Sequence, residues 1–241
     1  MTLCAEALTI TGRLDNVSAT LETGAITAIC GPNGAGKSTL LSSLAALIDT
    51  QDGQLLLDGK PLSSLSARKR AQRIGYLPQS GEVAWDVAVR QLVALGRLPH
   101  RDEGKAQVAR AIAECQLDDL ESRRMSTLSG GEKARALLSR VLAGEPQWIL
   151  ADEPLAALDL AHQLAILRVL RRQADAGCGV VLVLHDLALA MNHADRVLVL
   201  NNGRLQADSA PEEALSTGII AEVWGVKARW LGEPGARALS T

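Results

Sequence analysis

Residues 31–39 read Gly-Pro-Asn-Gly-Ala-Gly-Lys-Ser-Thr and fit the pattern G-x-x-x-x-G-K-[ST]. The apolar residues 26–30 before them are typical of a strand, and leucines recur at helical spacing from Leu40 to Leu47. In such a context the glycines let backbone N–H groups turn inward around a phosphate, and the helix start adds free donors. The sequence therefore predicts a nucleoside-triphosphate site, because an ordinary glycine-rich turn would give Lys37 and Ser38 no role.

Each residue type in this segment suits a triphosphate. Lys37 brings a mobile positive charge to the β- and γ-phosphates, and the Ser38 hydroxyl is placed to ligate Mg²⁺. The candidate nucleotide-binding residues are Gly31, Pro32, Asn33, Gly34, Ala35, Gly36, Lys37, Ser38 and Thr39.

Composition limits the class of protein. The chain has 241 residues, 47% of them hydrophobic, which suits one large domain or two small ones. Its formal net charge of −2 gives no reason to expect nucleic acid as a partner. No apolar run approaches the ~20 residues that span a bilayer, and no secretion signal is expected. The four cysteines form no close pair and no metal-binding spacing, which predicts buried thiols in a reducing compartment.

Hydrophobic periodicity and turn residues predict the order of elements. Unbroken apolar runs such as 148–151 and 180–184 are typical of parallel strands buried on both faces. The dipeptide Asn202-Gly203 predicts a hairpin between 196–200 and 204–207, and Pro211 is expected to open a short helix. Further strands are expected at 8–10, 26–30, 54–57 and 74–77, the first two joined through Gly12 and Gly24, and further helices at 67–72 and 159–174.

Residues 80–146 differ from the rest because only helical patterns occur there. One helix is marked by Val87 to Leu95 and is expected to stop at Gly96, a second ends near Asp118, and a third lies within 128–143. We therefore expect a single domain over 1–241, with an α/β core at 1–79 and 147–241 and a helical subdomain inserted at about 80–146.

Two acidic residues follow the strand expected at 148–151. In P-loop proteins an Asp at a strand end helps to hold Mg²⁺, which makes Asp152 a candidate metal ligand. Glu153 comes next and could take a proton from an attacking water. Acids after strands are common on surfaces, so it is their place downstream of a phosphate loop that supports this interpretation.

Residues 128–132 read Leu-Ser-Gly-Gly-Glu and have two compatible interpretations. Ser129 and Glu132 fit the S-x-x-E capping box that starts a helix. A helix start that carries Gly130 and Gly131 is also a possible second anion site. Two such sites in one chain suggest that both serve one nucleotide.

These motifs together resemble those of ATP-binding-cassette (ABC) ATPase subunits. The matching segments, in order, are GPNGAGKST, Gln79, LSGGE at 128–132, ILADEP at 149–154, Leu158-Asp159 and Leu184-His185-Asp186. The resemblance implies a P-loop NTPase (RecA-like) core with an N-terminal antiparallel β subdomain and the inserted helical subdomain. It also implies ATP and Mg²⁺ as cofactors and a head-to-tail dimer, in which the phosphate loop of one copy and the LSGGE segment of the other enclose each ATP.

The resemblance also implies roles for individual residues. Asp152, Ser38 and Gln79 would organise Mg²⁺, and Glu153 would be the general base. His185 would contact the γ-phosphate and steady the attacking water, whereas by itself it could be an ordinary polar residue at a strand end. Gln79 would sense the γ-phosphate or Mg²⁺. Thr39 would lie near the α-phosphate, and Ser129, Gly130 and Gly131 would contact the partner's ATP.

Two departures from the family pattern stand out. The family usually has an aromatic residue ahead of the phosphate loop, on which adenine stacks, but residues 8–14 contain none. Arg13 could lay its guanidinium plane over the base instead, while Ile10 or Thr11 could supply only a small apolar contact. The loop before Asp159 usually carries a small hydroxyl residue, where this chain has Ala156 and Ala157.

Residues 89–100 resemble a segment of the subunits that energise import of iron–siderophore complexes, haem and cobalamin. The ending Gly-Arg-Leu-Pro-His is the less generic part. This implies a separate permease that docks around residues 79–100, from Gln79 to His100, with Trp85 as a candidate anchor. It also implies a solute-binding protein and a peripheral location on the cytoplasmic face of the inner membrane.

Other functions stay open at this point. The chain could serve an importer of another solute or an exporter, since the permease and its binding protein read the solute. An ABC ATPase that transports nothing is disfavoured, because the chain has one cassette, no heptads and no basic patch.

Overall fold

A six-stranded sheet brings the predicted site segments to the carboxyl ends of its strands. The computed structural model describes residues 1–79 and 86–241, and it orders this sheet β10-β9-β3-β8-β7-β6. The strands from β9 to β6 run parallel, and β10 pairs antiparallel with β9. The strands are β3 (Ile26–Cys30), β6 (Ile74–Leu77), β7 (Trp148–Asp152), β8 (Gly179–Val183), β9 (Arg196–Asn201) and β10 (Arg204–Ser209).

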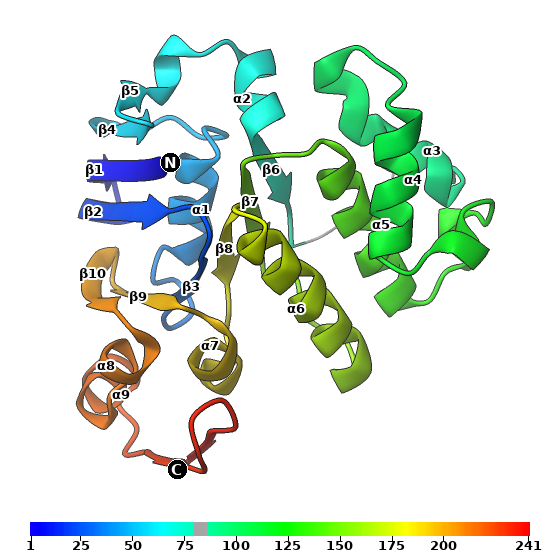
Figure 1. The fold of residues 1–241 in the computed structure, drawn as a ribbon. Coiled ribbons are helices and arrows are strands. Elements are labelled where there is room, and N and C mark those ends of the chain that lie inside the picture. Colours follow the sequence, from blue (N-terminus) through cyan, green and yellow to red (C-terminus); the bar gives the residue numbers. More distant parts are fainter. Residues whose placement is uncertain (80–85) are drawn as a thin grey trace.

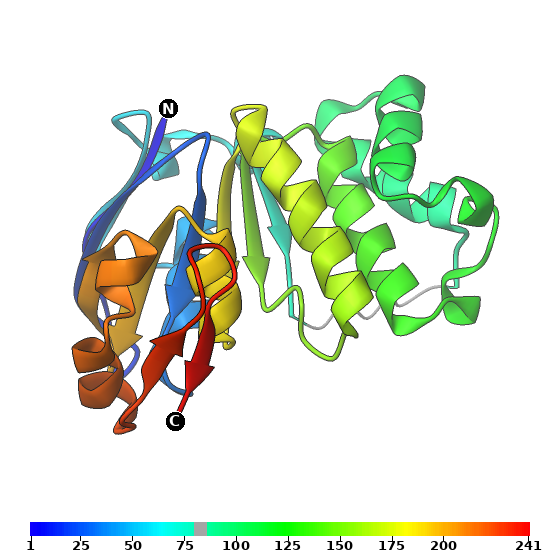
Figure 2. The same ribbon diagram turned by 60° about the horizontal axis from the view of Figure 1, so that its bottom comes forward.

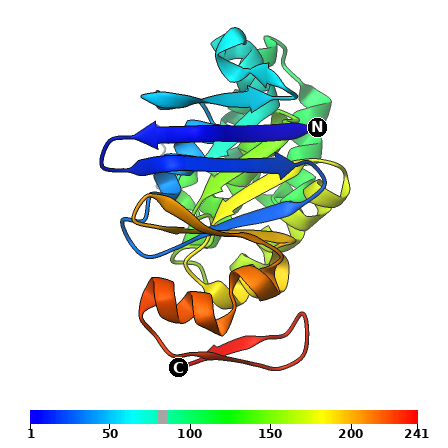
Figure 3. The ribbon, with the colours of Figure 1, turned by 90° about the vertical axis from the view of Figure 1, so that its left-hand side faces the viewer.

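A second, antiparallel sheet has the order β2-β1-β4-β5 and lies beside the first (Figure 3). It consists of β1 (Thr2–Ile10), β2 (Leu14–Glu22), β4 (Asp52–Leu57) and β5 (Lys60–Pro61). No separate strand was expected from the sequence at residues 14–22, where β2 lies. Val17, Ala19 and Leu21 alternate there with exposed residues, and this period of two is what a half-buried strand requires.

Helix α1 (Lys37–Leu44) lies between the two sheets (Figure 1). Leu40, Leu41 and Leu44 are buried there together with the inner face of the antiparallel sheet. The parallel strands contribute alternate residues to two cores: Val181 faces α1, whereas Val180 belongs to the core on the opposite face. Burial on both faces explains the unbroken apolar runs in the sequence.

The opposite face of the parallel sheet is covered by helices that run side by side (Figure 2). These are α5 (Gly130–Ala143), α6 (Leu160–Asp175) and α7 (Leu187–His193), with α3 (Val89–Ala94) and α4 (Lys105–Glu114) packed on α5, while α2 (Ala67–Arg73) precedes β6. This arrangement confirms the expected fold class. The expected boundary near residue 80 lies outside the described residues, so the division into core and helical subdomain stays a prediction.

Helix α3 ends at Ala94, two residues before the glycine at which it was expected to stop. Helix α3 continues directly into a 3₁₀ helix, Leu95–His100. A Cβ at Gly96 would overlap the carbonyl oxygen of Arg140. The glycine therefore permits close packing of this segment on α5, and the expected end of the α-helix near Gly96 is confirmed to within two residues.

The expected hairpin at Asn202-Gly203 is present between β9 and β10. Beyond it, α8 (Pro211–Ala214) is followed by α9 (Thr217–Trp224) and a small hairpin of β11 (Arg229–Leu231) and β12 (Ala238–Ser240). Neither α9 nor this hairpin was expected from the sequence. Asn192 of α7 fixes this hairpin by exchanging two 2.8 Å hydrogen bonds with the backbone of Arg237. In the part of the chain that the structure describes, no helix is both long and apolar enough to cross a membrane.

Candidate nucleotide-binding and catalytic site

The glycine-rich loop connects β3 to α1, and two of its glycines are sterically required. Gly36 has φ +100°, and a Cβ there would lie 2.6 Å from the carbonyl oxygen of Arg13. At Gly31, with φ +154°, a Cβ would overlap the carbonyl oxygen of Leu200. Only glycine adopts such backbone angles readily while neighbouring backbone lies this close. The rest of the chain therefore holds the loop in a fixed shape.

Lys37 lies in the first turn of α1 and folds back over its own loop. Its Nζ donates to the carbonyl oxygens of Gly31 and Pro32, both at 2.9 Å. Burial lowers the pKa of this ammonium, and the nearby carboxylates of Glu153 and Asp152 act in the opposite direction. A cation held beside the loop suits a phosphate chain that lies in it.

Ser38 and Asp152 meet although they are far apart in sequence. The Ser38 hydroxyl donates to Asp152 Oδ1 at 3.0 Å, across the end of β7. Burial raises the pKa of this carboxyl, and the Ser38 hydrogen bond opposes the shift. Among the described residues no cluster of three His, Cys, Asp or Glu could hold a metal. A hydroxyl and a carboxylate side by side nonetheless fit Mg²⁺, which takes one or two protein oxygens together with substrate phosphates.

Glu153 lies next to Asp152, and both its carboxylate oxygens are engaged. Gln79 Nε2 donates to Oε2 at 2.7 Å, and His185 Nε2 pairs with Oε1 at 2.5 Å. Because a carboxylate only accepts, the Nε2 of His185 carries the proton. Gln79 follows β6, Glu153 follows β7 and His185 follows β8, so three neighbouring strand ends build this group. Glu153 has φ +48°, a left-handed backbone that is rare for a residue with a side chain.

The predicted capping box at the start of α5 is confirmed. Ser129 Oγ accepts from the backbone N–H of Glu132 at 3.3 Å, and the Glu132 carboxylate accepts from the Ser129 N–H at 2.7 Å. Helices α1 and α5 pack on opposite faces of the parallel sheet. No hydrogen bond of the described residues joins Ser129 to the glycine-rich loop, so its contact with nucleotide stays a prediction that needs a second chain.

The turn between β1 and β2 lies over the glycine-rich loop, because Arg13 O is the backbone atom nearest to Gly36. Thr11 is tied down by Gln51, whose Oε1 accepts from the Thr11 hydroxyl at 2.6 Å. Tyr76 lies on β6 beneath α1, where its hydroxyl meets Ser42 Oγ at 3.3 Å. It is thus no stacking platform for the base. Arg13 is exposed, and its backbone lies against Gly36.

One buried charged residue was not expected from the sequence. Arg97 is only 4% exposed and pairs with Asp102 at 2.7 Å and Glu145 at 3.3 Å. An arginine in a short Gly-Arg-Leu-Pro-His segment gives no sign of such burial. Trp85, the candidate permease anchor, lies outside the described residues.

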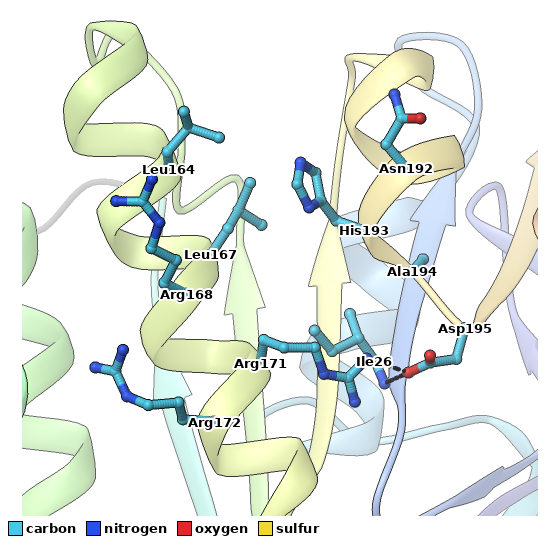
Figure 4. A pocket seen from close by; sticks show the side chains of 10 residues that line it. All are labelled: Ile26, Leu164, Leu167, Arg168, Arg171, Arg172, Asn192, His193, Ala194 and Asp195. Atoms are coloured by element: carbon cyan, nitrogen blue, oxygen red, sulfur yellow. Dashed lines mark hydrogen bonds and ion pairs between the residues drawn. The ribbon is translucent and has the colours of Figure 1, made fainter. Parts of the chain in front are cut away.

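A cavity of about 560 Å³ lies between α6 and α7, away from Glu153. Figure 4 shows Arg171 facing Asp195, while Arg168 and Arg172 turn away from His193. Its charged groups do not converge, so it is no candidate for the phosphate site. A smaller cavity of about 190 Å³ is lined by Glu153, His185 and the alanines at 156 and 157, and belongs to the catalytic group.

The glycine-rich loop leads from a strand into a helix, and an Asp at the end of another strand contacts the serine of that loop. These features define a P-loop nucleotide-binding protein. Within that class, the profile of the family described as ABC transporter matches residues 14–156, more than half of the chain. The chain therefore belongs to the ABC transporter family and is an ATP-binding ATPase of that family.

Relatives and solved structures agree with this assignment. The chain is 44% identical over 231 residues to the hemin import ATP-binding protein HmuV of Streptomyces coelicolor, covering 94% of this chain and 82% of the relative. It is 45% identical to the protein of the same name from Myxococcus xanthus, over 90% of this chain and 86% of the relative. The structure of cbiO1 from Clostridium perfringens, part of the ABC transporter complex cbiONQ, superposes with a TM-score of 0.80 at 27% identity, covering 91% of this chain and 92% of that one.

Proposed function

We propose that this chain is the ATP-hydrolysing subunit of an importer for haem or a related iron chelate or cobalamin. The observation that carries the enzymatic part is the Glu153 carboxylate held between Gln79 and His185, beside the Ser38–Asp152 pair. The import part is supported by relatives at 44% and 45% identity that are named hemin import ATP-binding proteins.

The residues divide the work of hydrolysis. Backbone N–H groups of the glycine-rich loop and Lys37 bind the phosphates, while Ser38 and Asp152 would hold Mg²⁺, which neutralises charge on the phosphates when bound. Glu153 takes the proton of the attacking water. Gln79 and His185 donate hydrogen bonds to the Glu153 carboxylate. When nucleotide enters, each can donate to a γ-phosphate oxygen instead. The Glu153 oxygen that is released can then accept a hydrogen bond from the attacking water.

The proposed working unit is a head-to-tail dimer. In this dimer the capped helix start at Ser129 would meet the nucleotide of a second copy. The packing of α5 and α1 on opposite faces of the sheet supports this, because it separates Ser129 from the phosphate loop of its own chain. Gly130 supports this arrangement, since it is exposed and a side chain there would meet open space. Ser129, Gly130 and Gly131 would then complete the phosphate site of the partner.

The proposed partners in transport are a separate permease, which docks around residues 79–100, and a solute-binding protein that delivers the solute to it. The location that follows is the cytoplasmic face of the inner membrane, where the chain is held by the permease. Leu98 supports the docking region, since it is an apolar side chain that is 69% exposed.

The test is to purify the chain with its co-expressed permease and to measure ATP hydrolysis with binding proteins loaded with haem, a ferric siderophore or cobalamin. We expect stimulation by one of these, with haem favoured, and none from the same binding protein without its solute. Phosphate release that no loaded binding protein raises, from a complex that hydrolyses ATP, would contradict the import assignment.

A further inference from the structure

One imidazole contacts two segments that lie far apart in the sequence. His162, in the first turn of α6, hydrogen-bonds Asp159 Oδ1 twice, through its backbone N–H at 2.9 Å and its ring Nδ1 at 2.7 Å. These hydrogen bonds hold the pKa of Asp159 below its ordinary value. The carboxylate accepts, so the proton is on Nδ1, and the ring has a fixed orientation.

The other edge of this ring lies against Gly131 at the start of α5. A Cβ at Gly131 would overlap His162 at Cδ2, Cγ and Nε2. Gly131 is buried, whereas its neighbour Gly130 is exposed. The two glycines therefore differ. Gly130 is exposed to solvent, whereas the missing side chain of Gly131 allows the imidazole to contact the backbone of α5.

Asp159 is also the end of a short loop that begins at Glu153. Residues 154–158 carry only apolar side chains, so no polar side chain of the loop fixes its path. Ala157 has φ +58°, which adds a second left-handed residue to that of Glu153. The loop is held from α6, where Gln163 Nε2 donates to the carbonyl oxygen of Leu155 at 3.2 Å and His162 binds Asp159.

We propose that His162 is a positioning residue that couples the two ATP sites of the dimer. This inference rests on the proposed head-to-tail dimer. There the start of α5 meets the partner's nucleotide, while Glu153 of the same chain serves its own. A shift of α5 at Gly131 moves His162, which moves Asp159 and the loop that leads back to Glu153. Contact of the α5 start with the partner's ATP at one site thereby sets the position of the general base, Glu153, at the other site.

The first test uses the full chain with His162→Ala and His162→Asn. We expect His162→Ala to leave ATP binding to the monomer unchanged, to lower kcat by ~10–100-fold through misplacement of Glu153, and to reduce the Hill coefficient to about 1, as for independent sites. Asparagine places an amide N–H near the position of Nδ1, so His162→Asn recovers part of the cooperativity. A matched control is His193→Ala, which removes a half-buried histidine from the α6–α7 cavity and should keep wild-type cooperativity.

A wild-type Hill coefficient of 1, or wild-type kcat and cooperativity in His162→Ala, would overturn the proposal. So would an asparagine variant no better than the alanine variant in both quantities. A wild-type chain that binds ATP but forms no dimer and hydrolyses none would instead contradict the proposed function, so the two failures are distinguishable.

The second test addresses packing alone. Gly131→Ala is expected to lower the Tm of the monomer, because the new methyl group overlaps the imidazole. Adding His162→Ala removes the overlapping ring, so the double variant should recover Tm relative to Gly131→Ala. Two residues in contact are non-additive in this way, whereas additive losses of Tm would show that the contact is absent in solution.

Discussion

Glu153→Gln separates the proton-accepting role of Glu153 from its place in the hydrogen-bond network. The carboxylate accepts from Gln79 at 2.7 Å and pairs with His185 at 2.5 Å. A glutamine amide of the same size has one acceptor and one donor end. His185 can therefore keep its acceptor, and Gln79 can turn its own amide to accept instead of donate. The fold and the contacts to ATP should survive.

The expected loss lies in the chemical step. Removal of a general base costs ~10²–10⁴-fold in rate, which corresponds to ~2.7–5.4 kcal/mol of activation free energy. Phosphate release at saturating ATP measures this loss. Because ATP is bound and not consumed, we also expect the variant to stay in a closed dimer, which light scattering detects.

The control is Glu222→Gln, an equal change at an exposed position of α9. It should hydrolyse ATP like the wild type and should form no long-lived dimer. Near-normal hydrolysis by Glu153→Gln, or only monomer at saturating ATP, would refute the assignment of Glu153 as the base.

Three other outcomes are expected. Ser129→Ala should abolish hydrolysis while the monomer still binds ATP. Its control is Ser66→Ala, which removes the equivalent cap of α2, lowers the free energy of unfolding by a similar ~0.5–2 kcal/mol and should leave activity near normal. Competition binding should show GTP within about tenfold of ATP, a gap of ~1.4 kcal/mol, because the phosphates dominate binding where no aromatic residue stacks on the base; a preference of several hundredfold would reveal a base-reading contact. Thiol titration of the folded chain at pH 8 should label only Cys4. Burial raises the pKa of the other three thiols, Cys30, Cys115 and Cys178, to about 12 and keeps them protonated. Unfolding the chain should make these three thiols reactive.

The sequence predicted the parts of the fold in which one local pattern settles the structure. The buried parallel strands appear as unbroken apolar runs, and the glycine-rich loop appears as a motif that its neighbours make sterically necessary. Strand β2 was missed because its alternation is interrupted by polar residues near Asn16, which has φ +53°. The last hairpin packs against α7, and α9 buries Ile220 and Val223 in the core, a tertiary context that no local pattern contains.

The candidate site divides in the same way. Lys37, Ser38 and Asp152 carry their chemistry in motifs, so they could be named from the sequence. His162 could not, because its importance arises only when α6 lies beside α5 and its ring meets Gly131. Ser129 lies between these cases: the S-x-x-E spacing predicts its cap, which the structure confirms, but not the nucleotide contact that needs a second chain.

Residues 89–100, the segment that narrows the resemblance to importers, have structural partners of their own. Gly96 lies against the backbone of α5, Arg97 is buried among carboxylates, and the Pro99 carbonyl oxygen accepts from Arg68 of α2 at 2.6 Å. These residues have a structural reason that involves no permease, whereas the exposed Leu98 has none. Likeness in this segment therefore has an explanation in these contacts. It does not identify the solute.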